Sequence, residues 1–240
     1  CAGWTRFRLP CCDGVLKMDG NSRTIQTAQT GPHDKLRELL ARHRDQTYRK
    51  PVAPWNADAF DRAMAAWGGS TPLILDAGCG VGWSTLVLAQ SFPDHFVIGV
   101  DQSEDRLGRG KPQQAPDNLV FVRADLVDFW RLLLQSRVPL SRHYVLYPNP
   151  WPKIGQLARR WHGHPVFPVI PQLGGVFECR SNWRTYLDEL AIAFDALTGQ
   201  LPPVEDWLPA QPMTPFERKY LASGQALYCL RLTLSGGPLS

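Results

Sequence analysis

The sequence lacks a long apolar run, because no stretch approaches the ~18 consecutive apolar residues that a membrane-spanning helix requires. Its amino terminus also lacks the charged, then apolar, then small-residue order of a secretory signal peptide. None of the six cysteines is spaced as Cys-x-x-Cys, so neither a zinc site nor a disulfide framework is indicated. These absences predict a soluble protein of the reducing cytoplasm without a membrane partner.

Patterns of metal ligands are scarce as well. His162 and His164 are two positions apart, which suits a metal site on a loop, but no cysteine or acidic residue stands near them in the sequence. We therefore expect no bound metal, and we expect both histidines to face solvent or RNA.

A large excess of one charge is also missing, because 26 Lys and Arg residues stand against 22 Asp and Glu residues, for a net charge of +4. The basic residues are nevertheless concentrated in two segments. A solvated helix face could account for either segment alone, but the two together predict a substrate that carries phosphates. The first segment holds Lys35, Arg37, Arg42, His43, Arg44, Arg49 and Lys50, and the second holds Lys153, Arg159, Arg160, His162 and His164.

The chain is long enough, at 240 residues with 44% hydrophobic content, to bury one sizeable core. Residues 1–17 precede the first methionine, Met18, and show no helical or strand period, so we expect a disordered or non-native extension there. Residues 18–70 are predicted to form a helical segment, with one helix over 34–45 and another that runs from an Asn56 or Asp58 cap to Trp67. Residues 71–235 are the predicted main domain.

Apolar strands alternate with helical segments from residue 73 onward. The predicted strands cover residues 73–78, 96–101, 119–125, 144–147, 176–180 and 226–234. The predicted helices cover residues 82–91, a short piece after 101, 128–135, and 182–197 with Ser181 or Asn182 as the cap. Pro165, Pro168 and Pro171 argue against a full helix before residue 176. The alternation predicts an α/β fold whose parallel sheet is covered on both faces.

A glycine-rich turn follows the first predicted strand. Gly78, Gly80 and Gly82 would let the backbone approach a ligand closely. Asp101 ends the second strand ~20 residues later, where an acid meets ribose hydroxyls in dinucleotide-binding folds. This pair of features predicts a nucleotide-type cofactor.

Two further acids shift that prediction from a dinucleotide to S-adenosylmethionine. Asp76 precedes the glycines, where it suits the amino-acid portion of this cofactor and would repel a pyrophosphate. Asp125 ends the third strand and suits the adenine amino group. Each acid alone could be an ordinary cap or turn residue, but three acids at successive strand ends predict a cofactor site.

The stretch YPNPWPK, residues 147–153, sets Asn149 between two prolines. The prolines fix φ and exclude a helix directly after the fourth strand. We therefore expect Asn149 on a stiff loop at a strand end, where open α/β sheets bind ligands. The alternative is that Asn149 only caps this loop through its own backbone.

The motifs DAGCGVGWST, GVDQSEDRL, RAD, YPNPWPK, RSNW and TPFERKYLASGQALYCLRL, between residues 73 and 232, resemble the tRNA (guanine-N7)-methyltransferase family. The resemblance implies a class I methyltransferase (Rossmann-like) fold, with a mostly parallel seven-strand-type sheet, helices on both faces and an antiparallel last strand. It also implies transfer of the S-adenosylmethionine methyl group to a guanine in tRNA or other structured RNA.

Taken with the residues above, the resemblance gives a set of candidate site residues. The candidate catalytic residues are Asn149 and Glu217. The cofactor residues are Asp76, Gly78, Gly80, Gly82, Asp101, Gln102, Asp125 and Asn149, and the substrate residues are Lys153, Arg159, Arg160, Asn182, Thr214 and Glu217.

Two positions depart from the family, which usually has aspartate where this chain has Asn149 and Asn182. A carboxylate can accept from both guanine N1–H and the exocyclic amine, whereas an amide offers one acceptor oxygen. Glu217 retains a carboxylate and is expected to orient guanine alone. Two alternatives stay open: a methyltransferase of the same fold acting on another base or substrate, and a weakened RNA-binding homologue. The sequence does not decide between a monomer and a homodimer.

Overall fold

The computed structural model describes residues 20–46, 48–109 and 115–239. The expectation about residues 1–17 therefore lies outside the described residues. A seven-stranded sheet forms the centre of the molecule, with strand order β3-β2-β1-β4-β5-β7-β6. The strands are β1 (Leu73–Ala77), β2 (Phe96–Asp101), β3 (Leu119–Arg123), β4 (Arg142–Leu146), β5 (Gly175–Ser181), β6 (Val204–Asp206) and β7 (Tyr228–Leu234).

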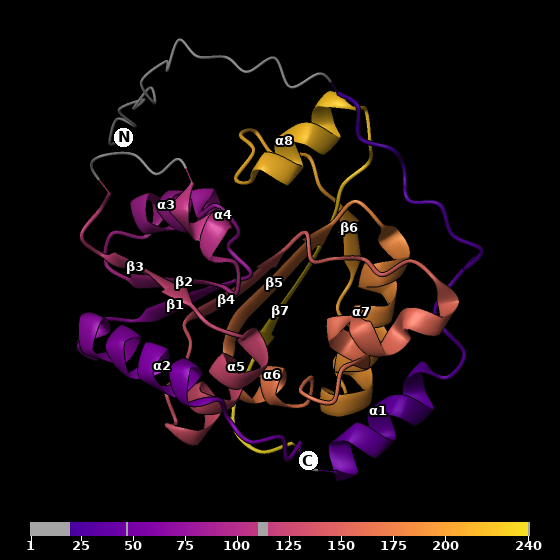
Figure 1. The fold of residues 1–240 in the computed structure, drawn as a ribbon. Helices are drawn as coiled ribbons and strands as arrows, with labels where there is room; N and C mark the ends of the chain where they lie inside the picture. Colours follow the sequence, from indigo (N-terminus) through magenta and orange to yellow (C-terminus); the bar gives the residue numbers. More distant parts are fainter. Residues whose placement is uncertain (1–19, 47, 110–114, 240) are drawn as a thin grey trace, which may run out of the picture.

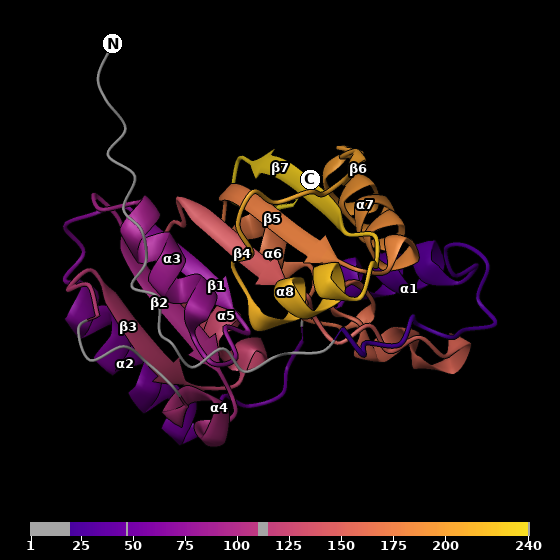
Figure 2. The ribbon, with the colours of Figure 1, turned by 90° about the horizontal axis from the view of Figure 1, so that it is seen from above.

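The strand directions confirm the predicted class I methyltransferase topology. Strands β1 to β5 are mutually parallel, and β7 runs antiparallel to β5. The short strand β6 pairs antiparallel with β7 at the edge of the sheet, and the sequence analysis did not predict it. Figure 2 shows the strands from β3 to β7 side by side in this order.

Helices cover both faces of the sheet, as the buried apolar strands require. Figure 1 shows α3 and α4 on one face and α2, α5, α6 and α7 on the other, with α1 packed outside α7. The helices are α1 (Leu36–Asp45), α2 (Pro54–Trp67), α3 (Trp83–Ser91), α4 (Glu104–Gly108), α5 (Leu126–Gln135), α6 (Val169–Gln172), α7 (Arg184–Thr198) and α8 (Pro215–Ala222), with the 3-10 helices η1 (Ile154–Arg159) and η2 (Trp161–Gly163) between β4 and α6.

The core consists of two apolar clusters, one on each face. The larger cluster joins the sheet to α1, α2, α5, α6 and α7, and includes Leu36, Phe60 and Phe194. The smaller cluster joins Ile74 and Tyr144 of the sheet to α3 and to the loops and helix around α8. Within the described part of the chain, every helix falls short of the length and apolarity needed to cross a bilayer.

Two of the predicted helix caps are wrong. Helix α2 begins at Pro54 after Ala53, and Asn56 lies buried inside its first turns. The Asn56 amide instead donates to Asp128 Oδ2 at 2.7 Å and accepts from the Asp125 backbone N–H at 3.0 Å, because a helix that packs on α5 must satisfy buried polar groups there. Helix α7 begins after Trp183 with no side-chain cap.

Residues 20–33, here named the strap, run in extended form along one side of the molecule from α8 to α1 (Figure 1). At one end, the Ser22 N–H donates to Ser223 Oγ at 3.1 Å, beyond the end of α8. Farther along, Thr27 Oγ1 donates to the carbonyl of Pro152 at 2.5 Å. The strap therefore connects α8 with the loop that contains the YPNPWPK stretch.

Candidate functional site

A cavity of about 540 Å³ opens at the carboxyl ends of β1, β2, β3 and β4. Strand β1 pairs with β2 on one side and β4 on the other, so the cavity lies at the topological switch point where open α/β sheets bind ligands. Its wall consists of Ala77, Gly78, Cys79, Gly80, Val81, Ser84, Asp101, Gln102, Arg106, Arg109, Ala124, Asp125, Leu126, Leu146, Tyr147, Pro148, Asn149, Pro150, Trp161, Thr214, Pro215, Phe216 and Tyr220.

The glycine loop forms the floor of this cavity, and its glycines serve two purposes. Gly78 and Gly80 have φ of +80° and +58°, which L side chains rarely adopt, and both line the cavity. No heavy atom lies within 4 Å of a Cβ added at Gly80, so its missing side chain leaves open space for a ligand. Gly82 does not line the cavity. Its missing side chain makes room for Phe121, because a Cβ at Gly82 would lie 2.3 Å from Cε1 of Phe121.

Asp101 stands at the cavity wall with its carboxylate already oriented. The backbone N–H of Gly80 donates to Oδ2 at 3.0 Å and that of Ser103 donates to Oδ1 at 2.8 Å. A carboxylate has about four acceptor positions, so these two amides leave room for two ligand hydroxyls. The Arg106 guanidinium lies 3.7 Å from Oδ2 and partly balances the charge.

Asp125 and Gln102 also line the cavity, at the ends of β3 and β2. The Asp125 side chain caps α5, since Oδ1 accepts from the Val127 N–H at 2.8 Å. Asp125 can therefore cap α5 and contact the cofactor at the same time, because Oδ1 accepts the capping bond while the residue lines the cavity.

Asp76 lies behind the glycine loop and does not line the cavity. Its Oδ2 accepts from Ser84 Oγ at 2.6 Å and Thr85 Oγ1 at 2.7 Å, both in the first turn of α3. Burial raises the pKa of Asp76 to about 6, although both hydroxyls oppose that rise. The structure therefore assigns Asp76 a bond that holds α3 against β1, and direct contact with the cofactor stays a prediction.

The YPNPWPK loop places Asn149 at the same cavity, as an exposed residue. Tyr147 and Trp151, on either side, have φ of +53° and +45°. Bulky residues rarely adopt this conformation and do so mainly where the surrounding structure enforces it, often at functional sites. Asn149 Oδ1 also accepts a long hydrogen bond, 3.4 Å, from the Trp151 N–H, so the alternative role as a loop cap is partly realised.

Thr214 lines the cavity, but Glu217 does not, and the expectation that Glu217 orients guanine is corrected. Its side chain is fully buried, with 0% exposure. Four donors occupy the carboxylate: the Tyr147 hydroxyl at 2.8 Å, the Trp207 Nε1 at 2.9 Å, the Arg180 guanidinium at 3.1 Å and the Met213 N–H at 2.6 Å. Burial, and then the Glu217 charge, raise the pKa of Tyr147, which keeps its hydroxyl a donor.

The predicted RNA-facing residues separate into two groups. Lys153 and Arg159 are exposed beside the loop, and the Arg159 guanidinium lies 4.8 Å from the centre of the Trp151 ring. Arg160 and His162 are fully buried, so the expectations that Arg160 contacts RNA phosphate and that His162 faces solvent or RNA are wrong. Neither Lys153 nor Arg159 lines the cavity.

Asn182 also lies outside the cavity wall, half-buried at the end of β5. Its Nδ2 donates to Gln225 Oε1 at 2.8 Å, and Gln225 Nε2 donates to the Ser22 carbonyl of the strap at 2.9 Å. The structure thus gives Asn182 a partner that holds the strap, and contact with substrate stays a prediction.

The sequence analysis missed several residues of the wall. Arg106 and Arg109 come from α4 and its carboxyl end, and Trp161 comes from η2, where its ring packs against that of Trp130 with centroids 4.7 Å apart. Phe216 and Tyr220 of α8 stack on each other, and Phe216 is 50% exposed. Their spacing of four residues in TPFERKY was a usable signal, because it places both rings on one face of a helix.

Comparison with known proteins agrees with this geometry. The family model described as "Putative methyltransferase" matches residues 70–230. A tRNA (guanine-N(7)-)-methyltransferase of Mycolicibacterium gilvum (strain PYR-GCK) is 30% identical over 225 residues, which are 87% of this chain and 82% of that protein. One from Nocardioides sp. (strain ATCC BAA-499 / JS614) is 30% identical over 169 residues, or 66% of each protein.

A solved structure shows the same fold at lower identity. A point mutant of the 16S rRNA (adenine(1408)-N(1))-methyltransferase from Catenulisporales acidiphilia, with cosubstrate SAM, aligns with a TM-score of 0.51 and 20% identity, over 75% of this chain and 92% of that one. One family accounts for the order of the strands, for the cavity at the switch point of the sheet and for the sequence matches over most of the chain. The chain belongs to the tRNA (guanine-N(7)-)-methyltransferase family, and it is an S-adenosylmethionine-dependent methyltransferase.

Proposed function

We propose that this protein methylates N7 of a guanine in tRNA. The observation that supports this most directly is that the glycine loop, Asp101 and the YPNPWPK loop all line one cavity. A methyl donor and a base can therefore meet in one cavity. The curated relatives, which carry this activity in their names, support the choice of base and of RNA.

The donor set on one side of the cavity fits the cofactor. Asp101 has acceptor positions for the ribose hydroxyls, and the open space at Gly80 lets the backbone approach the ligand. Asp125 and Gln102 line the same cavity, and we assign them to the adenine side of the cofactor. Bound S-adenosylmethionine supplies a methyl group activated by its sulfonium charge.

The protein's own contribution is to orient the base. Guanine N7 carries an unprotonated lone pair, so the reaction needs an in-line approach and no strong general base. Asn149 lines the same cavity as the cofactor residues, and Phe216, which is 50% exposed, offers a ring on which a base can stack. Glu217 acts indirectly, because it holds Tyr147 and the Met213 backbone in place.

The RNA would lie across exposed basic residues of the two basic segments. Lys153 and Arg159 remain candidates for phosphate contacts, as do the exposed Lys35, Arg42, Arg49 and Lys50 of the first segment, where the exposed Arg44 pairs with Asp45 at 3.1 Å. Arg37 is less available, because it pairs with Asp195 at 2.9 Å. A tRNA substrate would place the protein in the cytoplasm.

One observation favours a second candidate, a methyltransferase of the same fold that acts on another base. Among the described residues that line the cavity, only Asp101 and Asp125 carry carboxylates, and both belong to the cofactor side. The base side offers the Asn149 amide, which suits a base with different donors and acceptors from guanine.

One experiment separates the two candidates. The purified protein is incubated with methyl-labelled S-adenosylmethionine and unmodified bulk tRNA, and the RNA is then digested to nucleosides. We expect the label in 7-methylguanosine when the parent protein is used, and about tenfold less of it with an Asp101→Ala control at cofactor concentrations below the parent's Kd. Label in a methylated adenosine, or in ribosomal RNA alone, would contradict the proposal and support the second candidate.

A further inference from the structure

One buried arginine, Arg160, hydrogen-bonds to the backbone of the YPNPWPK loop. Arg160 Nε donates to the Trp151 carbonyl at 3.1 Å and Nη2 donates to the same oxygen at 3.0 Å. Trp151 is the residue with φ of +45°, two positions after Asn149. A conformation of this kind persists only when neighbouring groups enforce it, and the two donors of Arg160 fix the direction of this carbonyl.

The position of Arg160 is itself fixed. Its side chain is 0% exposed, and Nη1 lies 2.6 Å from Oε2 of Glu189, which is also 0% exposed and belongs to α7. The guanidinium lies 4.9 Å from the centre of the Trp183 ring. A planar guanidinium directs its donors in a rigid fork, so fixing one edge on α7 aims the other edge at the loop.

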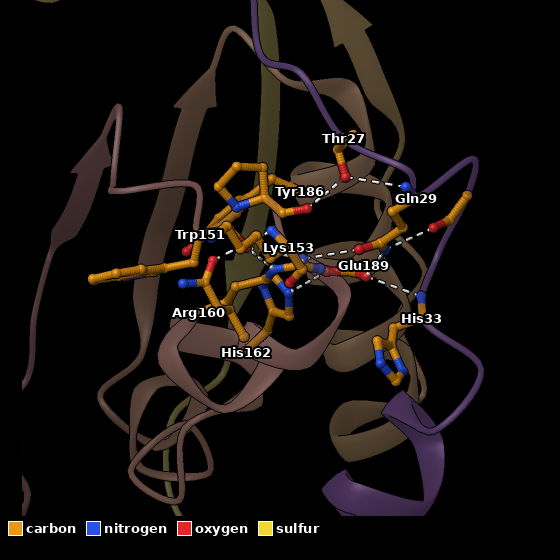
Figure 3. A network of polar contacts seen from close by, with 12 residues as sticks. Thr27, Gln29, His33, Trp151, Lys153, Arg160, His162, Tyr186 and Glu189 are labelled. Atoms are coloured by element: carbon orange, nitrogen blue, oxygen red, sulfur yellow. Dashed lines mark hydrogen bonds and ion pairs between the residues drawn. The ribbon is translucent and has the colours of Figure 1, made fainter.

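The strap completes the same network (Figure 3). Gln29 donates to Glu189 Oε1 at 2.6 Å and accepts from Arg160 Nη2 at 2.8 Å. Thr27 Oγ1 donates to the Pro152 carbonyl at 2.5 Å, one residue beyond Trp151. His162 Nε2 lies 2.7 Å from Glu189 Oε2, and burial lowers the pKa of His162, so the neutral ring donates this bond.

We propose that Arg160 is a positioning residue for methyl transfer, and that Glu189 and the strap residue Gln29 hold it in place. These three residues form a clamp that sets the direction of the loop on which Asn149 faces the cavity. They touch neither cofactor nor base, because none of them lines the cavity. The proposal rests on the proposed function in one respect only, namely that the loop acts on the substrate.

Two variants and a matched control test the clamp. Arg160→Lys keeps a positive charge for Glu189 but lacks the fork that reaches the Trp151 carbonyl. Gln29→Ala removes the two Gln29 contacts, with Glu189 and with Arg160, and leaves the buried ion pair and the His33 N–H contact to Glu189 intact, which guards against a variant that does not fold. Gln26→Ala is the control, because Gln26 is an exposed glutamine of the same strap.

Three measurements on the full chain distinguish positioning from bulk stability. We expect both variants to lower kcat for tRNA by about tenfold or more, since small misplacements of a substrate-orienting group have effects of this size. We expect the affinity for S-adenosylmethionine to change less than about twofold, because the clamp does not contact the glycine loop or Asp101. Hydrogen exchange should be faster in the backbone of residues 147–158 and unchanged in β1 to β3.

The control should match the parent protein in all three measurements. Parent-like turnover and parent-like exchange in both variants, or faster exchange spread evenly over the sheet, would overturn the proposal. The exchange measurement needs no RNA, so it still tests the clamp if the protein methylates a base other than the one proposed.

Discussion

Asp101 is the residue on which the cofactor assignment depends most. Its two backbone donors keep the carboxylate at the cavity wall before any ligand binds. A charge-assisted hydrogen bond contributes about 1.5 to 3 kcal/mol, which corresponds to about tenfold or more in affinity. The side chain is thus prepared for a ligand with hydroxyl donors.

We expect Asp101→Ala to weaken S-adenosylmethionine binding about tenfold or more, as measured by calorimetry. Asp94→Ala is a suitable control, because Asp94 is an exposed acid between α3 and β2 that does not line the cavity. Unchanged affinity in the Asp101 variant would show that the ribose hydroxyls bind elsewhere.

Asp76 should make the stability of the protein depend on pH. Burial raises its folded-state pKa from 3.8 to about 6, so the folded state binds a proton that the unfolded state has already lost between these values. Stability therefore falls as pH rises through this window, by about 3 kcal/mol in total.

We expect the Asp76→Asn variant to escape this loss. The free energy of unfolding of the variant, relative to that of the parent, should rise between about pH 4 and pH 6 and stay constant above it. Urea unfolding without cofactor at several pH values measures the difference. A difference that stays constant over the window would contradict the role of burial at this carboxyl.

The sequence predicts the positions of some site residues and not of others. Gly78, Gly80, Asp101 and Asp125 line the cavity, because residues at strand ends and in a glycine turn keep their local positions in any sheet of this type, and their contact with the cofactor stays a prediction. Arg160 was misplaced because its burial depends on α7, 29 residues farther along the chain. No pattern in the residues around Arg160 predicts that Glu189 binds it.

Helix α8 and the loop before it form a separate element that depends on Glu217. The Thr214 side chain caps the helix by accepting from the Glu217 N–H at 3.0 Å, while the Glu217 carboxylate binds Tyr147, Arg180 and Trp207 outside the helix. One residue thus joins α8 to both β4 and β5 at the cavity.

We expect Glu217→Ala to destabilise the protein by about 3 kcal/mol or more, since it leaves buried donors unpaired next to Arg180. Thr214→Ala is the comparison, with an expected loss of about 1 kcal/mol for a helix cap. Urea unfolding would measure both. An equal, small loss in the two variants would show that the carboxylate does not anchor this element.

The elements themselves were largely predictable. Alternation of apolar strands and amphipathic helices indicated six of the seven strands, because burial on both faces leaves a clear apolar signal. Strand β6 escaped notice, since its three residues, Val204–Asp206, include two exposed acids at the edge of the sheet. The prolines before residue 176 correctly indicated a broken crossover, which the structure divides into η1, η2 and the four-residue α6.

Across the whole molecule, fewer basic residues are free to contact RNA than the two basic segments of the sequence predicted. With Arg160 buried and Arg37 paired, the basic residues available to RNA are fewer than the two clusters implied. Arg159 becomes the clearest remaining candidate beside the loop, because its guanidinium is exposed and lies against the Trp151 ring.

We expect Arg159→Ala to reduce the slope of the logarithm of RNA affinity against the logarithm of salt concentration by about 0.7 to 0.9, the value for one lost phosphate contact. Arg62→Ala, an exposed residue of α2, is the control. Filter binding over a range of salt concentrations measures the slope. A slope equal to that of the parent would show that Arg159 is only a solvated side chain.

The strap also determines when the active protein can be completed during synthesis. Ser22 and Ser223 are joined across 201 residues, and Gln29 and Glu189 across 160. The strap leaves the ribosome before every strand of the sheet, yet its partners Pro152, Arg160, Glu189 and Ser223 are made much later. The cofactor side, built from β1 to β3, can form while translation continues, but the substrate side must wait for the end of the chain and for closure of a very long loop. A nascent chain stopped before α7 would lack Glu189, Thr214 and Phe216, and would therefore have no fixed place for the base.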